Sequence, residues 1–298
     1  MPKIQVLGVP HTYELTPPRN FPHVLVFLHG WLLSRKYWQP VVARLSSEYQ
    51  CLTYDMRGFG DSQPLEASQL NTTAAIGREM PAATDESPYS LQAYARDLCE
   101  LLNALQVPSA WLVGHSLGGS VAFWGAQQSS QLVQGIVGLN AGGGIYLKEE
   151  FERFRGAGQQ LLHFRPHWLR YLPLVDVMFS RANVARPVAL HWGRQRVVDF
   201  VSAQREAALG TLLDSTTEAE VHRLPQVVSQ LKQPVYFIAG TDDKVMEPKY
   251  VKHLASFHPM FDCHGQNVIE IPHCGHMAMI EQPDAIAEQL RFILQQHA

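Results

Sequence analysis

Residues 111–119 have the sequence WLVGHSLGG, in which a short apolar run passes directly into a serine flanked by glycines. The run indicates the end of a buried strand, and the small residues after the serine indicate the start of a helix. Gly114 and Gly118 flank a turn so sharp that side chains there would collide with the neighbouring strand and helix. We therefore expect a strained backbone at Ser116, with its hydroxyl raised above the edge of the sheet as a nucleophile. A chance turn of the same composition is the alternative, and the flanking strand and helix argue against it.

Backbone N–H groups close to this serine are predicted to form an oxyanion hole. The predicted helix begins beside Ser116, so it presents the N–H of Leu117 first. The segment His29-Gly30-Trp31 follows an apolar run and has the form of a loop that donates a second N–H, from Trp31. The same three residues are candidate substrate contacts. An ordinary turn between a strand and a loop is the alternative interpretation of this segment.

Strand-like and helix-like segments alternate through the first 140 residues. An apolar face over residues 91–105, with Ser90 placed to cap it, is typical of a helix. Because no hairpin signal interrupts the alternation, we predict an α/β fold with a mostly parallel, doubly wound sheet. Buried strands are predicted from short apolar runs at residues 24–28, 51–54, 110–113 and 135–139.

The alternation stops after Asn140. Residues 145–230 indicate helices without a buried strand, and predicted strands then resume at residues 235–239 and 267–271. A helical block inserted into an α/β core is typical of a lid. We therefore predict two units, a core of residues 1–144 and 231–298 and a helical cap of residues 145–230.

Composition and charge exclude several classes of protein. The chain has 298 residues, of which 46% are hydrophobic and 17% charged, so it can bury a large core and is not disordered. A net charge of −3 gives no reason to expect nucleic-acid binding. No apolar run approaches the ~18 residues of a membrane span, and the first 15 residues do not resemble a signal peptide. Four cysteines in a chain of this length suggest reduced thiols, so we expect a globular protein of the cytoplasm.

The chain resembles the α/β-hydrolase superfamily over nearly its whole length. The segment Asp55-Met56-Arg57-Gly58-Phe59-Gly60-Asp61-Ser62, which we interpret as a structural turn, is one carrier of the resemblance. The others are His29-Gly30-Trp31, Gly114-His115-Ser116-Leu117-Gly118-Gly119, Gly240-Thr241-Asp242-Asp243 and Gly275-His276. The resemblance implies an α/β-hydrolase fold with a helical cap and a catalytic triad in the order nucleophile, acid, histidine.

The resemblance also indicates which residues form the triad. Ser116 is the nucleophile, and the family spacing selects Asp243 as the acid, with Asp242 as the lesser candidate. Gly275-His276 selects His276 as the histidine, although His273 lies in the same predicted loop. His276 would take the proton of Ser116, while Asp243 would fix the tautomer of the imidazole and stabilise the imidazolium.

Metal and cofactor chemistry is not indicated. Cys263, His264, His273, Cys274 and His276 crowd one stretch, but their spacing fits no template for zinc. We therefore expect neither a metal nor a cofactor. Serine at position 116, where dehalogenases and epoxide hydrolases carry aspartate, argues against those two chemistries.

The predicted cap is rich in arginine and aromatic residues. The arginines form either a solvated lid surface or a grip on an anionic substrate. The aromatics Trp168, Tyr171, Phe179 and Trp192 form either a pocket wall or the packing of the cap on the core. The arginines are Arg153, Arg155, Arg165, Arg170, Arg181, Arg186, Arg194, Arg196 and Arg205.

These features favour a serine hydrolase that cleaves a carboxylic ester or related acyl bond of a small molecule. A first alternative is a lyase on the same triad, similar to the menaquinone-pathway synthase, in which the triad acts as a base that eliminates pyruvate. The elbow of that enzyme usually has tyrosine before the serine and arginine after the turn, whereas this chain has His115 and Ser120. A second alternative is a non-catalytic small-molecule receptor on the same fold. We expect no nucleic-acid partner and no stable membrane insertion, and the oligomeric state is left open.

Overall fold

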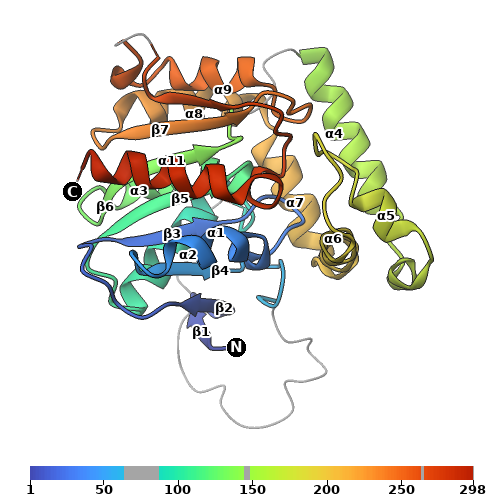
Figure 1. Cartoon of the computed structure of the whole chain (residues 1–298). Helices are drawn as coiled ribbons and strands as arrows, with labels where there is room; N and C mark the ends of the chain where they lie inside the picture. The colour runs from blue at the N-terminus through green and yellow to red at the C-terminus, as the bar shows by residue number, and fades with distance from the viewer. Residues whose placement is uncertain (64–86, 144–147, 263–264, 298) are drawn as a thin grey trace.

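The computed structural model describes residues 1–63, 87–143, 148–262 and 265–297 (Figure 1). Gly144, Cys263 and His264 lie outside these residues. One sheet of eight strands organises the core, in the order β1-β2-β4-β3-β5-β6-β7-β8. The strands are β1 Lys3–Val6, β2 Val9–Leu15, β3 Val24–Leu28, β4 Cys51–Tyr54, β5 Ala110–His115, β6 Val133–Leu139, β7 Val235–Gly240 and β8 Val268–Ile271.

The strands from β4 to β8 are parallel, as predicted, and they are covered on both faces. Along β3, Val26 and Leu28 pack with one apolar cluster while Leu25 and Phe27 pack with the other. A continuous apolar run is the pattern that a strand buried on two sides requires. The core helices are η1 Arg35–Trp38, α1 Gln39–Leu45, α2 Leu91–Ala104, α3 Leu117–Gln128, α9 Pro248–Ala255, η4 Pro259–Asp262, α10 Ala278–Glu281 and α11 Pro283–Gln295.

The sheet is antiparallel at its N-terminal edge, where the sequence showed no hairpin signal. Strands β1 and β2 form an antiparallel hairpin, and β2 pairs antiparallel with β4. The turn between them is Leu7-Gly8, and both residues have positive φ angles, +47° and +80°. A two-residue turn of this kind matches the twist of the strands that it joins, and glycine adopts it without strain.

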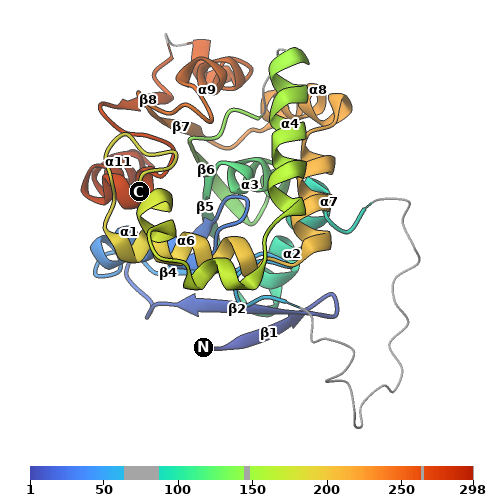
Figure 2. The same ribbon diagram turned by 90° about the vertical axis from the view of Figure 1, so that its right-hand side faces the viewer.

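A block of helices separates β6 from β7 in the chain, where the cap was predicted, and we call this block the cap. It contains α4 Lys148–His163, η3 His167–Tyr171, α5 Val175–Phe179, α6 Leu190–Ser202, α7 Arg205–Ser215 and α8 Glu218–Gln230. Figure 2 shows α4, α6 and α7 in front of strands β5 and β6. The last of these helices, α8, packs against α3 and α9 of the core through Leu224 and Val228, among others. The cap boundary at residue 230 stays a prediction, and these contacts favour an earlier end.

The parallel strands all point their carboxyl ends toward one edge of the sheet. Ser116, Asn140, Asp243 and His276 follow β5, β6, β7 and β8, respectively, at that edge. In a parallel α/β sheet, the loops at this edge are where ligands bind.

No helix in the described part of the chain is both long and apolar enough to cross a membrane.

Candidate active site

Ser116 occupies the sharp turn that the sequence predicted between β5 and α3. Its backbone has φ +52° and ψ −119°, a strained conformation for a residue with a side chain. Its N–H donates to the carbonyl of Leu139 at 2.9 Å, which fixes the turn to the end of β6. A Cβ atom on Gly114 would collide with the backbone of Gly118. The turn is therefore possible only because both flanking residues lack side chains.

The two predicted oxyanion donors lie on neighbouring backbone segments. Leu117 is the first residue of α3, so its N–H is free of the helical hydrogen-bond ladder. A Cβ atom on Gly118 would stand 2.5 Å from the carbonyl oxygen of His29, which shows how closely α3 approaches the loop after β3. Trp31 lies in that loop, and its indole N–H donates to the carbonyl of Ala208 in α7 at 2.9 Å.

The structure brings Asp243 and His276 into direct contact. The Nδ1 atom of His276 lies 2.8 Å from the Oδ2 atom of Asp243, and both side chains are buried. The second carboxylate oxygen of Asp243 accepts the N–H groups of Val245 and Met246 at 2.8 and 2.9 Å. Because a carboxylate only accepts, Nδ1 carries the proton and Nε2 of His276 is left to accept one.

The alternative candidates for the acid and the histidine, Asp242 and His273, lie away from this contact. Asp242 and His273 are exposed, and their side chains approach each other at 3.9 Å on the surface. His273 is held there by its N–H, which donates to the hydroxyl of Thr241. Geometry therefore favours Asp243 and His276 over these neighbours.

Two buried side chains fix the loop that carries His276. The Nε2–H of His115 donates to the carbonyl of His276 at 2.8 Å, and the two rings are in contact, with centroids 4.8 Å apart. Burial and the neighbouring His276 hold the pKa of His115 well below its ordinary value, so this ring is neutral. The Nδ2 group of Asn140 donates to the carbonyls of Gly275 and His276 at 3.0 and 2.9 Å. Asn140 was not predicted as a site residue, although a polar residue directly after a buried strand was a visible signal.

Glu281 makes a third connection to the same loop, and it also reaches the cap. Its Oε2 atom accepts the N–H groups of Gly275 at 3.0 Å and of Ala185 at 2.7 Å, and its Oε1 atom accepts the N–H of Met277 at 3.0 Å. The N–H of His276 donates to the carbonyl of Asn183 at 3.0 Å. One carboxylate thus holds both residues that flank His276 and ties them to the segment before α6. Glu281 was not predicted as a site residue.

His29 and Gly30 do not fit the expectation that they contact substrate. His29 has no exposed surface, and its Nε2 atom accepts the N–H of Met56 at 3.0 Å while Nδ1 donates to the carbonyl of Gly30 at 2.8 Å. A Cβ atom on Gly30 would stand 2.8 Å from the ring of His115. Both residues therefore serve close packing behind the site. Trp31, which is partly exposed, remains the candidate contact of the three.

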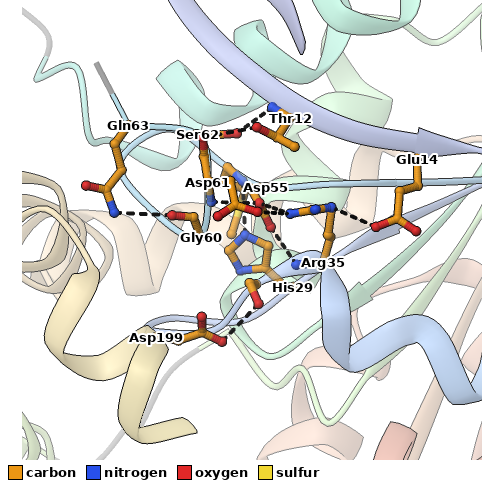
Figure 3. A network of polar contacts seen from close by, with 12 residues as sticks. Thr12, Glu14, His29, Arg35, Asp55, Gly60, Asp61, Ser62, Gln63 and Asp199 are labelled. Carbon is orange, nitrogen blue, oxygen red and sulfur yellow. Dashed lines mark hydrogen bonds and ion pairs between the residues drawn. The ribbon is translucent and has the colours of Figure 1, made fainter. Parts of the chain in front are cut away.

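The segment after β4 is structural, as interpreted from the sequence. Figure 3 shows the buried guanidinium of Arg35 among the carboxylates of Glu14, Asp55 and Asp61. Asp55 also accepts the N–H groups of Arg35 at 2.7 Å and Asp61 at 2.9 Å. The turn is thus held by charge-assisted hydrogen bonds beneath the site. Arg57 instead pairs with Asp97 of α2.

One contact between cap and core contains a buried acid. The hydroxyl of Ser34 donates to Asp199 of α6 at 2.9 Å, and Gln195 donates to the other carboxylate oxygen at 2.9 Å. Beside it, Tyr37 stacks on Trp192 with ring centroids 5.6 Å apart. Burial raises the pKa of Asp199 to about 7. Trp192 therefore packs the cap on the core, which was one of the two interpretations of the cap aromatics.

The cap arginines divide into two groups. Arg196 is buried, and its guanidinium donates to the carbonyls of Phe179 and Ala182, so it is a structural residue. Arg155 and Arg165 also donate to backbone carbonyls, those of Thr216 and Phe200. The exposed group contains Arg153, Arg181, Arg186, Arg194 and Arg205, while Arg170 is half-buried beside Tyr171.

Metal ligands do not gather among the residues that the structure describes: no three side chains of His, Cys, Asp or Glu meet there. Cys51, Cys99 and Cys274 are buried free thiols. Burial raises the pKa of Cys274 to about 12, so this thiol is inert at neutral pH although it lies near His276. The absence of a metal or cofactor stays a prediction.

Comparison with known proteins places the chain in a family. The family model of the α/β-hydrolase fold matches residues 23–283. A bifunctional esterase/perhydrolase of Acinetobacter calcoaceticus is 28% identical over 80% of this chain and 80% of its own. A 2-succinyl-6-hydroxy-2,4-cyclohexadiene-1-carboxylate synthase of Enterobacter is 26% identical over 91% of both chains. The solved structure of a thermophilic esterase from Thermogutta terrifontis superposes with a TM-score of 0.72 at 21% identity, covering 99% of each chain. From the matched family model and the fold, the chain belongs to the α/β-hydrolase family and is an enzyme.

Proposed function

We propose that the protein is a serine hydrolase that cleaves a carboxylic ester of a small molecule through an acyl-enzyme. The observation that carries the proposal is the 2.8 Å contact between His276 Nδ1 and Asp243, at the same sheet edge as the strained Ser116. The contact of the His115 and His276 rings brings the two loops together, since His115 directly precedes Ser116. The esterases among the similar proteins support the reaction class.

These positions support the following reaction. The Nε2 atom of His276 takes the proton of the Ser116 hydroxyl as its oxygen attacks the ester carbonyl carbon. The N–H groups of Leu117 and Trp31 would stabilise the negative charge that develops on the carbonyl oxygen. The imidazolium then returns the proton to the leaving alkoxide, which departs as an alcohol. A water molecule, deprotonated by His276, attacks the acyl-enzyme, and the acid leaves as Ser116 recovers its proton.

Turnover of a panel of p-nitrophenyl esters of increasing chain length tests the proposal. The wild-type protein should release p-nitrophenol from at least one ester, and Ser116→Ala should lose this activity. Absence of turnover on every ester in a correctly folded wild-type protein would contradict the proposal.

A lyase reaction is the second candidate, because the synthase relatives match most of the chain. In that reaction arginines would hold the carboxylates of the substrate, and the buried Arg196 is not available for this role because it is bound to backbone carbonyls. Pyruvate release from the precursor of 2-succinyl-6-hydroxy-2,4-cyclohexadiene-1-carboxylate, without turnover of any ester, would favour this candidate.

A further inference from the structure

A short segment of the cap exposes an unusual number of large apolar side chains. Six of them lie between residues 164 and 178, and each exposes between 42% and 74% of its surface. We name this group the cap apolar surface: Phe164, Trp168, Tyr171, Leu172, Leu174 and Met178. It spans η3 and α5, which lie at the outer edge of the molecule, far from β1 (Figure 1). The rings of Phe164 and Trp168 contact each other, with centroids 6.3 Å apart, and large exposed apolar patches mark interaction sites.

The same part of the cap is strongly basic. Residues 153–198 contain eight arginines and one acidic residue, Asp176, whereas the whole chain has a net charge of −3. The segment therefore carries a charge of +7 when histidines are neutral, and the remainder of the chain is acidic. Arg153, Arg181 and Arg194 are exposed, so part of this charge reaches solvent, whereas Arg196 is buried against backbone carbonyls. A basic surface with aromatic side chains is complementary to an anionic surface with an apolar interior.

A cavity of about 620 Å³ adjoins the cap apolar surface. Its lining includes Phe164, the cationic Arg165 and Arg205, and His163, together with Glu206 as an acid. Burial and repulsion by Arg205 lower the pKa of Arg165, so an anion between the two guanidinium groups would relieve that repulsion. Residues 203–205, at the start of α7, also line the cavity, and a helix N-terminus favours an anion.

We propose that the cap docks on an anionic lipid surface, with the cap apolar surface inserted among the lipids and a headgroup phosphate held in the cavity between Arg165 and Arg205. Trp168 and Tyr171 are suited to the interface of a bilayer, where one end of the ring is apolar and the other is wet. A second copy of the chain fits this surface less well, because the exposed arginines of the two copies, among them Arg181 and Arg194, would repel each other. The proposal concerns binding alone and does not depend on the ester hydrolysis proposed above.

Co-sedimentation with vesicles tests the proposal, using the Ser116→Ala protein so that lipid cleavage cannot confuse the result. The protein should bind vesicles that contain phosphatidylglycerol at least tenfold more tightly than vesicles of phosphatidylcholine alone. Raising the salt concentration from about 0.1 M to about 0.5 M should weaken binding severalfold, since the Debye length shortens. Equal binding to both kinds of vesicle, or no binding to either, would overturn the proposal.

Variants separate the cap apolar surface and the adjoining cavity from the rest of the molecular surface. Trp168→Ala should weaken vesicle binding about tenfold, and Arg165→Gln and Arg205→Gln should each weaken it roughly fivefold. Phe292→Ala on α11 and Arg223→Gln on α8 are matched controls, and both should bind as the parent does. Phe292 is 55% exposed, close to the exposure of Trp168. Cap variants that bind as tightly as the controls would contradict the assignment of this surface.

Two further measurements test whether another ligand occupies the cavity or a second copy of the chain covers the cap apolar surface. Thermal stabilisation by inorganic phosphate without vesicle binding would assign the cavity to a soluble phosphate and overturn docking on lipid. Dimerisation in analytical ultracentrifugation that Trp168→Ala abolishes would assign the cap apolar surface to a second copy, and this result would also overturn the proposal. A monomer that binds anionic vesicles is the expected outcome.

Discussion

Replacement of Glu281 by glutamine should change the position of His276 indirectly, through the loop that carries it. The carboxylate of Glu281 accepts three backbone N–H groups, those of Ala185, Gly275 and Met277, at 2.7, 3.0 and 3.0 Å. Glutamine offers one carbonyl oxygen, so its NH₂ group must face at least one of these donors. A lost hydrogen bond to a charged group costs about 1.5–3 kcal/mol, and we expect the free energy of unfolding to fall by about 2 kcal/mol.

The effect on catalysis should exceed the effect on binding. Two of the three donors flank His276, so the loop should shift and the imidazole should meet Ser116 in poorer geometry. A misplacement below 1 Å should lower kcat about tenfold, while KM should change less than twofold. Chemical denaturation measures the free energy of unfolding, and steady-state kinetics on the best ester measure kcat and KM.

A matched control is available on β8. Glu270 forms an exposed ion pair with Lys252 at 2.8 Å, so Glu270→Gln should change stability by less than about 1 kcal/mol and leave kcat unaltered. If Glu281→Gln were as stable and as active as Glu270→Gln, then the three hydrogen bonds would not hold the His276 loop and our reasoning would fail.

Three other substitutions test separate parts of the account. Asp243→Asn should lower kcat by roughly 10⁴, on the precedent of serine proteases, while Asp242→Asn should lower it only a fewfold; the reverse order would make Asp242 the acid. Gly118→Ala should lower kcat by about 10², because a Cβ atom 2.5 Å from a carbonyl of the loop after β3 must displace an oxyanion donor; unchanged kinetics would contradict this placement. Burial raises the pKa of Asp199 from 3.8 to about 7, so the folded state keeps a proton that the unfolded chain loses. The wild-type free energy of unfolding should therefore fall, by about 4 kcal/mol at most, as the pH rises from about 4 to about 7. Asp199→Asn should remove this loss in denaturation measured at several pH values, and an unchanged pH dependence would exclude Asp199 as its source.

The parallel core was predictable because burial on both faces leaves a continuous apolar run in the sequence. Such a run marks β3, and the glycines around Ser116 mark the turn after β5. The β1–β2 hairpin was missed because β1 exposes two of its four residues and carries no apolar run. Its turn, Leu7-Gly8, was the one local signal, and a single glycine occurs in many contexts.

The candidate site was predictable only where the chemistry demands a residue type at a fixed spacing. Asn140 and Glu281 act through backbone groups that the fold brings near, and Asn140 is 135 residues from the carbonyl of Gly275 that it binds. Nothing in the sequence distinguishes Arg196 from Arg194, yet the structure buries the first against two carbonyls and exposes the second. Tertiary proximity, not composition, decides such roles.

Covalent labelling of Ser116 is the most direct test of the proposed chemistry. A fluorophosphonate probe reacts with a serine that a histidine activates beside an oxyanion hole, and mass spectrometry locates the adduct. We expect a single adduct on the peptide that contains Ser116, lost in Ser116→Ala and strongly slowed in His276→Ala. Absence of labelling in the folded wild-type protein, or labelling that survives in Ser116→Ala, would contradict the account.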